Sequence, residues 1–213
     1  MDRLIGSFLM AVISHMSRSG KRGMYREGPS FQEFSQHAQS WAVLNDMLSQ
    51  EDARKVMHRT FEEEDVLRCY FSTCYELFRA CEKAGCYELT SQQMDWWVRL
   101  LDEHCTTCPE TPSNSRSECH AWSALPMYEL ISVMAGIRRE SGKPDFVEIC
   151  PHMDYVPDLK GMVHTEYGDI AFSYMPDGDY MRYEVTLPEG MNGRFLAPDG
   201  KAYELRAGNN VIL

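Results

Sequence analysis

Residues 110 to 128 hold the side chains in this 213-residue chain that are best suited to chemistry. Glu110 lies on a polar stretch beside Pro109, and His120 and Trp122 follow where a helix is expected to begin. A carboxylate can transfer a proton, an imidazole can hydrogen-bond hydroxyl groups, and an indole can pack on the apolar face of a sugar. The pattern indicates a carbohydrate site, and the plainer alternative for Glu110 is a solvated loop glutamate. On a regular helix Trp122 would point away from His120, which favours a core position for Trp122 over a sugar contact.

The eight cysteines indicate a different chemistry. His104, Cys105, Cys108, Cys119 and His120 contain a Cys-x-x-Cys pair and a Cys-His pair, which are ligand types that zinc prefers. A second Cys-x-x-Cys pair is absent, and most cysteines fall in segments with helical spacing. We therefore favour reduced, buried thiols over a zinc site, and we expect no cofactor and no metal.

Composition excludes several classes of protein. Hydrophobic residues make up 44% of the chain and charged residues 25%, as in ordinary globular proteins. The formal charge of -11 repels phosphate backbones, so we expect no nucleic-acid partner. An apolar run as long as a membrane span is absent, which argues against a membrane partner. Residues 1–17 are interpreted as a packed helix, with a signal sequence as the alternative, because Asp2 and the basic stretch after Ile13 do not fit a signal.

Apolar residues recur at helical spacing as far as about residue 138. A stripe from Val66 through Tyr70 and Cys74 to Cys81 ends at Gly85, and it predicts a helix. Ser49 and Thr90 are candidate N-terminal caps. The acidic run at residues 62–65 is interpreted as the start of a helix, where the helix dipole favours negative charge. Further helices are expected at about 32–48, 50–59, 90–103 and 118–137.

After Gly142 the spacing changes to that of strands and turns. Strands are expected at 146–149, 169–174 and 182–187, and turns at 188–190, 198–200 and 208–210. This spacing predicts a small antiparallel β-sandwich. The chain is therefore expected to be α-helical first and all-β second, with a domain of residues 1–140 and another of residues 141–213.

Four stretches together resemble the C-terminal part of a bacterial α-L-rhamnosidase, an inverting glycoside hydrolase. They are residues 34–44, residues 96–110, residues 115–130 with the motif Ser-Glu-Cys-His-Ala-Trp-Ser, and the tail from Gly136 to Asn210. The family fold is a barrel of six helical hairpins followed by a β-sandwich. The resemblance implies that this chain, with about six helices, is the last half of an (α/α)6 barrel plus the C-terminal sandwich.

The resemblance also assigns site residues. Glu110 takes the position of the general base, and His120 that of a sugar-contacting histidine. Gln36, His37 and Trp97 are further candidates for substrate binding, with packing between helices as the alternative for each. Inversion needs two carboxyl groups about 6.5–9.5 Å apart. The general acid of the family lies in the first half of the barrel, so we expect this chain alone to be inactive.

The resemblance implies glycosides containing L-rhamnose as the substrate. An exposed half-barrel would leave an apolar patch, which predicts self-association or a protein partner. A non-catalytic carbohydrate- or protein-binding derivative of the family is the alternative function. We expect a cytoplasmic location, with the periplasm as an alternative for a full-length parent protein.

Overall fold

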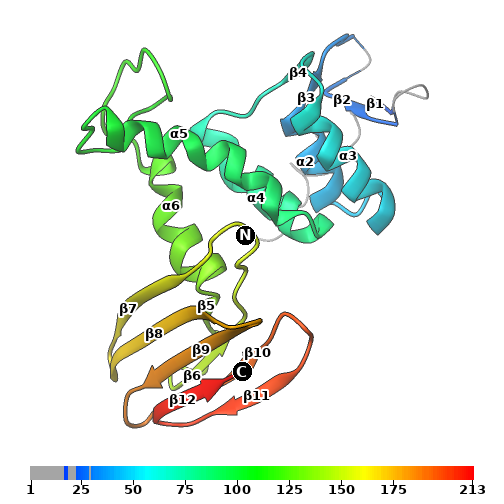
Figure 1. Cartoon of the computed structure of the whole chain (residues 1–213). Helices are drawn as coiled ribbons and strands as arrows, with labels where there is room; N and C mark the ends of the chain where they lie inside the picture. Colours follow the sequence, from blue (N-terminus) through cyan, green and yellow to red (C-terminus); the bar gives the residue numbers. More distant parts are fainter. Residues whose placement is uncertain (1–16, 19–22, 29) are drawn as a thin grey trace. The chain divides into compact units, whose positions relative to one another are not determined.

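The structure is a computed structural model that describes residues 17–18, 23–28 and 30–213 (Figure 1). It forms two compact units, residues 1–125 and 126–213. The first unit is mainly helical and the second is mainly β, which confirms the expected order of helices before strands. The helix and the signal sequence considered for residues 1–17 lie outside the described residues, except that Ser17 begins the short strand β1 (Ser17–Arg18).

The boundary between the units falls between Leu125 and Pro126, whereas the sequence analysis placed it after residue 140. The strand β5 (Ile137–Arg139) accounts for this difference, because it pairs with β6 (Phe146–Ile149) and so belongs to the β unit.

The described part of the first unit contains four α-helices: α2 (Gln36–Leu44), α3 (Gln50–Glu62), α4 (Cys74–Ala84) and α5 (Ser91–Asp102). Ser49 caps α3, since its hydroxyl accepts a hydrogen bond from the Asp52 N–H at 3.2 Å, as predicted. Gly85 ends α4 in the left-handed conformation, with φ of 70°, also as predicted.

The predicted start of α4 is wrong. Val66 lies in the two-residue strand β4 (Val66–Leu67), which pairs in parallel with β3 (Phe34–Ser35). Tyr70 precedes the 3₁₀ turn η1 (Phe71–Thr73), and α4 begins only at Cys74. Val66 is buried in this strand, and a single buried apolar residue fits the pattern of a helix as well as that of a short strand, so the apolar pattern did not distinguish the two.

Two expectations about helix ends also fail. Thr90 does not cap α5, because its hydroxyl donates to the Tyr87 carbonyl within the preceding 3₁₀ turn η2 (Tyr87–Thr90). The acidic run at residues 62–65 begins at Glu62, the last residue of α3, and does not start a helix. Glu63 is instead held by the Arg59 guanidinium, whose Nη2 lies 2.6 Å from Oε1. A basic residue near the C-terminal end of a helix is favourable there.

The helix α4 lies at the centre of the first unit, where it packs against α2 and α3 (Figure 1). Its apolar side is buried, including Leu77 and Phe78. Phe71 packs on the Trp97 indole, with ring centroids 4.4 Å apart, and so joins η1 to α5. The core of this unit fixes the C-terminal end of α5, from which the Glu110 loop departs.

The single helix expected at 118–137 is replaced by three shorter pieces. They are the 3₁₀ turn η3 (Ala121–Ala124), the short helix α6 (Leu125–Tyr128) and the π-helical segment η4 (Glu129–Met134). Pro126 lies in the first turn of α6, where its lack of an N–H is tolerated. Gly136 follows with φ of 69°, which ends the helical path before β5.

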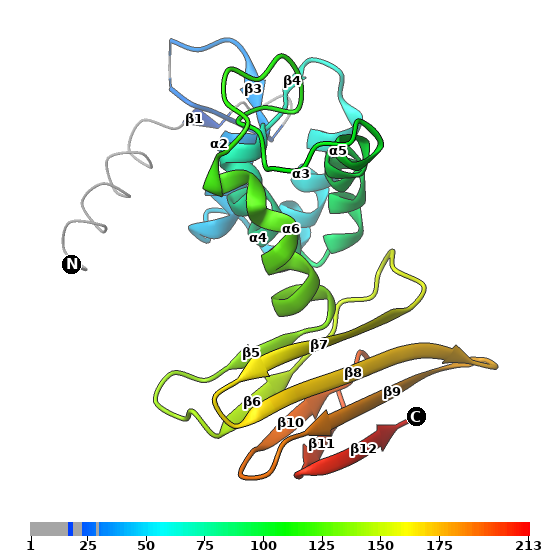
Figure 2. The ribbon, with the colours of Figure 1, turned by 90° about the vertical axis from the view of Figure 1, so that its left-hand side faces the viewer.

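The second unit contains two four-stranded sheets (Figure 2). The first has the strand order β12-β9-β8-β7 and is fully antiparallel, and the second has the order β11-β10-β6-β5. Their remaining strands are β7 (Leu159–Thr165), β8 (Gly168–Asp177), β9 (Tyr180–Leu187), β10 (Asn192–Leu196), β11 (Ala202–Leu205) and β12 (Gly208–Ile212). The strands predicted at 146–149, 169–174 and 182–187 are therefore confirmed.

Two details of the β unit differ from prediction. The β6–β10 pair is parallel, with Val147 opposite Gly193, so the second sheet is not purely antiparallel. The whole β7–β9 meander lies between these two strands in the chain, which allows the crossover that a parallel pair requires. Gly208 begins β12 and is not in a turn, and the Asn210 side chain instead closes the preceding turn by bonding the N–H and the carbonyl of Arg206.

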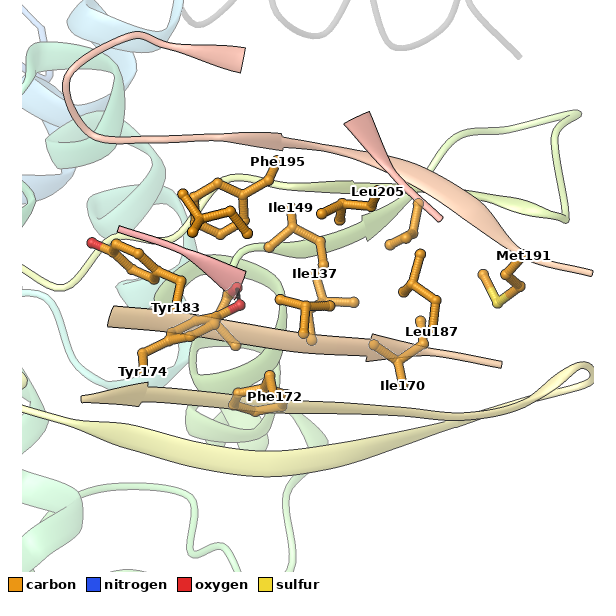
Figure 3. Packing of buried hydrophobic residues seen from close by; sticks show 14 residues of the cluster. Ile137, Ile149, Ile170, Phe172, Tyr174, Tyr183, Leu187, Met191, Phe195 and Leu205 are labelled. Carbon is orange, nitrogen blue, oxygen red and sulfur yellow. Dashed lines mark hydrogen bonds between the residues drawn. The ribbon is translucent and has the colours of Figure 1, made fainter. Parts of the chain in front are cut away.

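One apolar core lies between the two sheets (Figure 3). Phe195 and Ile149 come from one sheet, and Ile170 and Tyr174 come from the other. Tyr174 is fully buried, and its hydroxyl donates to the Ala135 carbonyl at 2.9 Å. Burial in this core raises the pKa of the Tyr174 phenol. A single core shared by facing sheets defines a β-sandwich.

Candidate functional site

The loop between α5 and η3 is held in shape by hydrogen bonds between its own two arms. The Glu110 N–H donates to the Ser117 carbonyl at 2.8 Å, and the His120 N–H donates to the Cys108 carbonyl at 2.7 Å. The Ser115 hydroxyl accepts from the Glu110 N–H at 2.9 Å and donates to the Ser117 carbonyl at 2.6 Å. These bonds fix the backbone of Glu110 although the loop has no helix or strand of its own.

The Glu110 carboxylate is paired with the guanidinium of Arg116 across this loop. Arg116 Nε lies 3.2 Å from Oε2, and Nη2 bonds Oε1, so the pair is bidentate. The Glu110 side chain is 14% exposed, whereas that of Arg116 is 86% exposed. The hydrogen bond from Arg116 lowers the pKa of Glu110 below its usual value, partial burial opposes this, and the charges of Arg116 and His120 reinforce it.

His120 and Trp122 lie beside the same loop. Their ring centroids are 4.3 Å apart, with 38° between the ring planes. The Trp122 indole N–H donates to the Glu110 carbonyl at 3.3 Å, and the indole is 45% exposed. Among the described residues, the buried Nδ1 of His120 has no hydrogen-bond partner. An exposed indole, an imidazole with a free nitrogen and a carboxylate therefore come together.

The position of Trp122 corrects the sequence analysis, which favoured a place in the core. That inference assumed a regular helix from residue 118, on which His120 and Trp122 would point in different directions. His120 is instead extended, with φ of -131° and ψ of 127°, and a 3₁₀ turn follows. This backbone places the two rings side by side.

Three other predicted site residues are engaged in packing. Trp97 is buried, and its indole N–H donates to the Ser123 carbonyl at 2.7 Å. Gln36 is also buried, where its amide accepts from the Cys69 N–H at 2.9 Å and donates to the Thr60 carbonyl at 3.3 Å. These contacts agree with the packing alternative for both residues, and their substrate-binding roles stay predictions.

His37 is half-buried on α2, and its Nε2 accepts a hydrogen bond from the Trp41 indole at 2.8 Å. Within the described part of the chain, no hydrogen bond, ion pair or ring contact joins Gln36 or His37 to Glu110. Of the predicted site residues, the structure therefore brings together Glu110 and His120. It adds Trp122 and Arg116, and Arg116 had no role in the sequence analysis.

The cysteines separate into two groups. Cys69, Cys74, Cys81 and Cys86 are buried, whereas Cys105 and Cys119 are exposed and Cys108 and Cys150 are half-buried, and all eight are free thiols. Within the described residues, no group of three or more His, Cys, Asp or Glu side chains is arranged to hold a metal ion. Among the helices that the structure describes, none is both long and apolar enough to cross a membrane.

Several solved structures share the fold of this chain. The chain is similar to the GH78 rhamnosidase of Bacillus sp. GL1, with a TM-score of 0.72 and 22% identity over 90% of this chain and 22% of that protein. It is similar to the Streptomyces avermitilis α-L-rhamnosidase solved with L-rhamnose, with a TM-score of 0.72 and 14% identity over 98% and 23%. The Aspergillus terreus α-L-rhamnosidase gives a TM-score of 0.70 and 14% identity over 83% and 23%.

The chain thus has the fold of a segment of an α-L-rhamnosidase, and the sequence-based recognition is confirmed at the level of fold. It spans less than a quarter of the length of these three proteins. No protein-family model and no curated protein sequence matches it.

Proposed function

We propose that this chain is part of an inverting α-L-rhamnosidase and that Glu110 is the general base. The observation that carries the proposal is the fold shared with bacterial and fungal α-L-rhamnosidases over most of the chain, with Glu110 on the loop beside His120 and Trp122. A general base must be ionised to accept a proton from water. The Arg116 guanidinium favours that charged form of Glu110.

The other residues of the site support a sugar as the ligand. The half-buried His120 imidazole is a hydrogen-bonding group beside Glu110, and the exposed face of Trp122 can pack on the apolar face of a sugar ring. The Ser115 hydroxyl would hold the backbone of Glu110 in place while the carboxylate acts. We propose that the helical unit is the last half of an (α/α)6 barrel, and that glycosides containing L-rhamnose are its substrates.

The general acid is not assigned to any residue of this chain, so we propose that the chain alone does not hydrolyse rhamnosides. The test is a hydrolysis assay with an aryl α-L-rhamnoside, run beside an NMR titration of the chain with L-rhamnose. Binding at Glu110, His120 and Trp122 without turnover supports the proposal. Turnover at rates ordinary for glycosidases would show that both carboxyl groups are present here. An absence of rhamnose binding at this loop would remove the assignment of Glu110.

A non-catalytic derivative of the family is the second candidate, and the Glu110–Arg116 pair favours it, since a carboxylate held by an arginine must be released before it can bind water. Rhamnose binding that survives Glu110→Gln unchanged would support this alternative.

Self-association is a further proposal, because Leu67, Tyr70, Val98 and Leu101 are exposed on the helical unit. Sedimentation analysis would separate a monomer from oligomers. The eight free thiols support a cytoplasmic location.

A further inference from the structure

A polar cavity of about 360 Å³ lies against the loop that carries Glu110. Pro109 and Thr111, the two neighbours of Glu110 in the chain, line the cavity, but Glu110 does not. Arg116, His120 and Trp122 are also absent from its lining. The Glu110 carboxylate therefore does not open into this cavity. Its volume is at the lower end of the range of about 300–1,000 Å³ for ligand pockets, which suits a small ligand.

The side chains that line this cavity offer hydrogen-bonding groups that the fold leaves unused. Among the described residues, the side chains of Glu103, Glu118, Thr106, Thr107 and Asn114 have no hydrogen-bond or ion-pair partner. Two carboxylates lie here without a cation, close to the C-terminal end of α5, whose dipole is also negative. A ligand that fits must therefore donate hydrogen bonds.

We propose that this cavity is a second binding site that takes a neutral, hydroxyl-rich saccharide unit, with Glu103 and Glu118 accepting hydrogen bonds from its hydroxyl groups. The hydroxyls of Thr106 and Thr107 and the amide of Asn114 can both donate and accept, as sugar hydroxyls do. Leu100, Pro109 and Pro112 supply apolar surface for the C–H groups of the ring. The choice of a saccharide rests on the proposed function.

The cavity is connected to the candidate base through one side chain. Ser115 lines the cavity, and its hydroxyl accepts the hydrogen bond from the Glu110 N–H. A saccharide that contacts the cavity side of this loop would therefore restrict the backbone that positions Glu110. The second site would hold a neighbouring sugar unit and steady the Glu110 loop at the same time.

The test is a titration of the ¹⁵N-labelled chain with L-rhamnose and with a rhamnose-containing disaccharide, followed by NMR chemical shifts. We expect saturable shifts at Thr106, Thr107 and Asn114. The double change Glu103→Gln and Glu118→Gln should raise the dissociation constant obtained from these shifts about tenfold, since it removes hydrogen bonds to charged acceptors. The double change Glu64→Gln and Glu189→Gln is the matched control, because both glutamates are exposed and neither lines the cavity, and it should leave the response of these three residues unchanged. The dispersion of the amide spectrum verifies that each variant is folded.

Three results would overturn the inference. Shifts confined to Glu110, Arg116 and His120 would support the proposed function but would show that no saccharide enters the cavity. An absence of saturable shifts at Thr106, Thr107 and Asn114 with either sugar would remove the second site. Shifts at these three residues with methylammonium but not with sugars would make it a cation site. Conversely, sugar-induced shifts there without any at Glu110 would keep this site and reject Glu110 as the base.

Discussion

Arg116 and Glu110 form a bidentate ion pair within one loop, in which the carboxylate is largely buried and the guanidinium is largely exposed. The exposed partner can leave the pair for water at little cost, whereas the carboxylate remains in place, held through its backbone by Ser115 and Trp122. The pair therefore keeps Glu110 ionised and oriented without locking it. Such a carboxylate suits the role of general base that we propose for Glu110.

Removing the arginine should raise the pKa of Glu110 toward its ordinary value, because the hydrogen bond and the charge that favour the carboxylate are lost. In the native chain the pair contributes stability above the unfolded pKa of about 4.3, and this contribution is lost as the pH falls through the lower folded pKa. Carboxyl ¹³C shifts followed against pH in Arg116→Gln would measure the change. Arg99→Gln, which removes an exposed charge from α5, is the matched control and should have no effect. An unchanged Glu110 pKa in Arg116→Gln would contradict this account.

Gly136→Ala should destabilise the β unit by more than about 3 kcal/mol. A Cβ at this position would lie 2.1 Å from the carbonyl carbon and oxygen of Cys150, and φ is also 69°. Gly142→Ala is the matched control, because its φ is 82° but nothing lies within 4 Å of the added Cβ. The free energy of unfolding of Gly142→Ala should fall by only about 1 kcal/mol, which is the cost of the left-handed backbone alone. Urea unfolding of both variants gives the comparison, and equal losses would show that the close approach to Cys150 relaxes.

Gln36→Leu should lower the free energy of unfolding by about 2–3 kcal/mol, because it leaves the buried Cys69 N–H without a partner. The result bears on function, since Gln36 is also a candidate for substrate binding. Thermal unfolding and rhamnose titration of this variant separate the two roles. A variant of normal stability that has lost its rhamnose binding would favour the substrate role over the packing role. Gln32→Leu, at an exposed position on the same unit, is the control and should change neither measurement.

The thiols should react with a disulfide reagent in two groups at pH 8. Cys105 and Cys119 are exposed and should be labelled in the folded protein. Cys69 should be protected, because it is buried and because burial raises its pKa to about 11. In denaturant all eight cysteines should react. Labelling of Cys69 as fast as that of Cys105 in the folded protein would show that the helical core opens readily.

The features that the sequence predicted correctly depend on neighbouring residues. The Ser49 cap and the stop at Gly85 are set within one helical turn, and the β9 strand follows from its own alternation of buried and exposed residues. The features that it missed depend on contacts across the fold. Val66 forms a strand because Phe34 lies beside it, and Trp122 is exposed because the chain around it is not one regular helix.

The residues of the candidate site also separate into those that the sequence identified and those whose role depends on the folded chain. Glu110 and His120 were identified from their residue types and from the resemblance. Arg116 lies within the stretch 115–130 that resembles the family, but nothing in the spacing showed that it would reach back to Glu110. The side chains of Gln36 and Trp97 have the right chemistry for a sugar, yet their partners are backbone groups of the core. Burial, which decides between these roles, is a property of the folded chain.

The parallel pairing of β6 with β10 has a consequence for the order in which the protein is made. Residues 146–149 leave the ribosome well before residues 192–196, with the whole β7–β9 meander between them. During that interval the free edge of β6 has only β5 beside it, and an unpaired strand edge can join another chain. Folding of the β unit is therefore delayed until residues 192–196 have been synthesised, and β6 is the strand through which nascent chains are expected to aggregate.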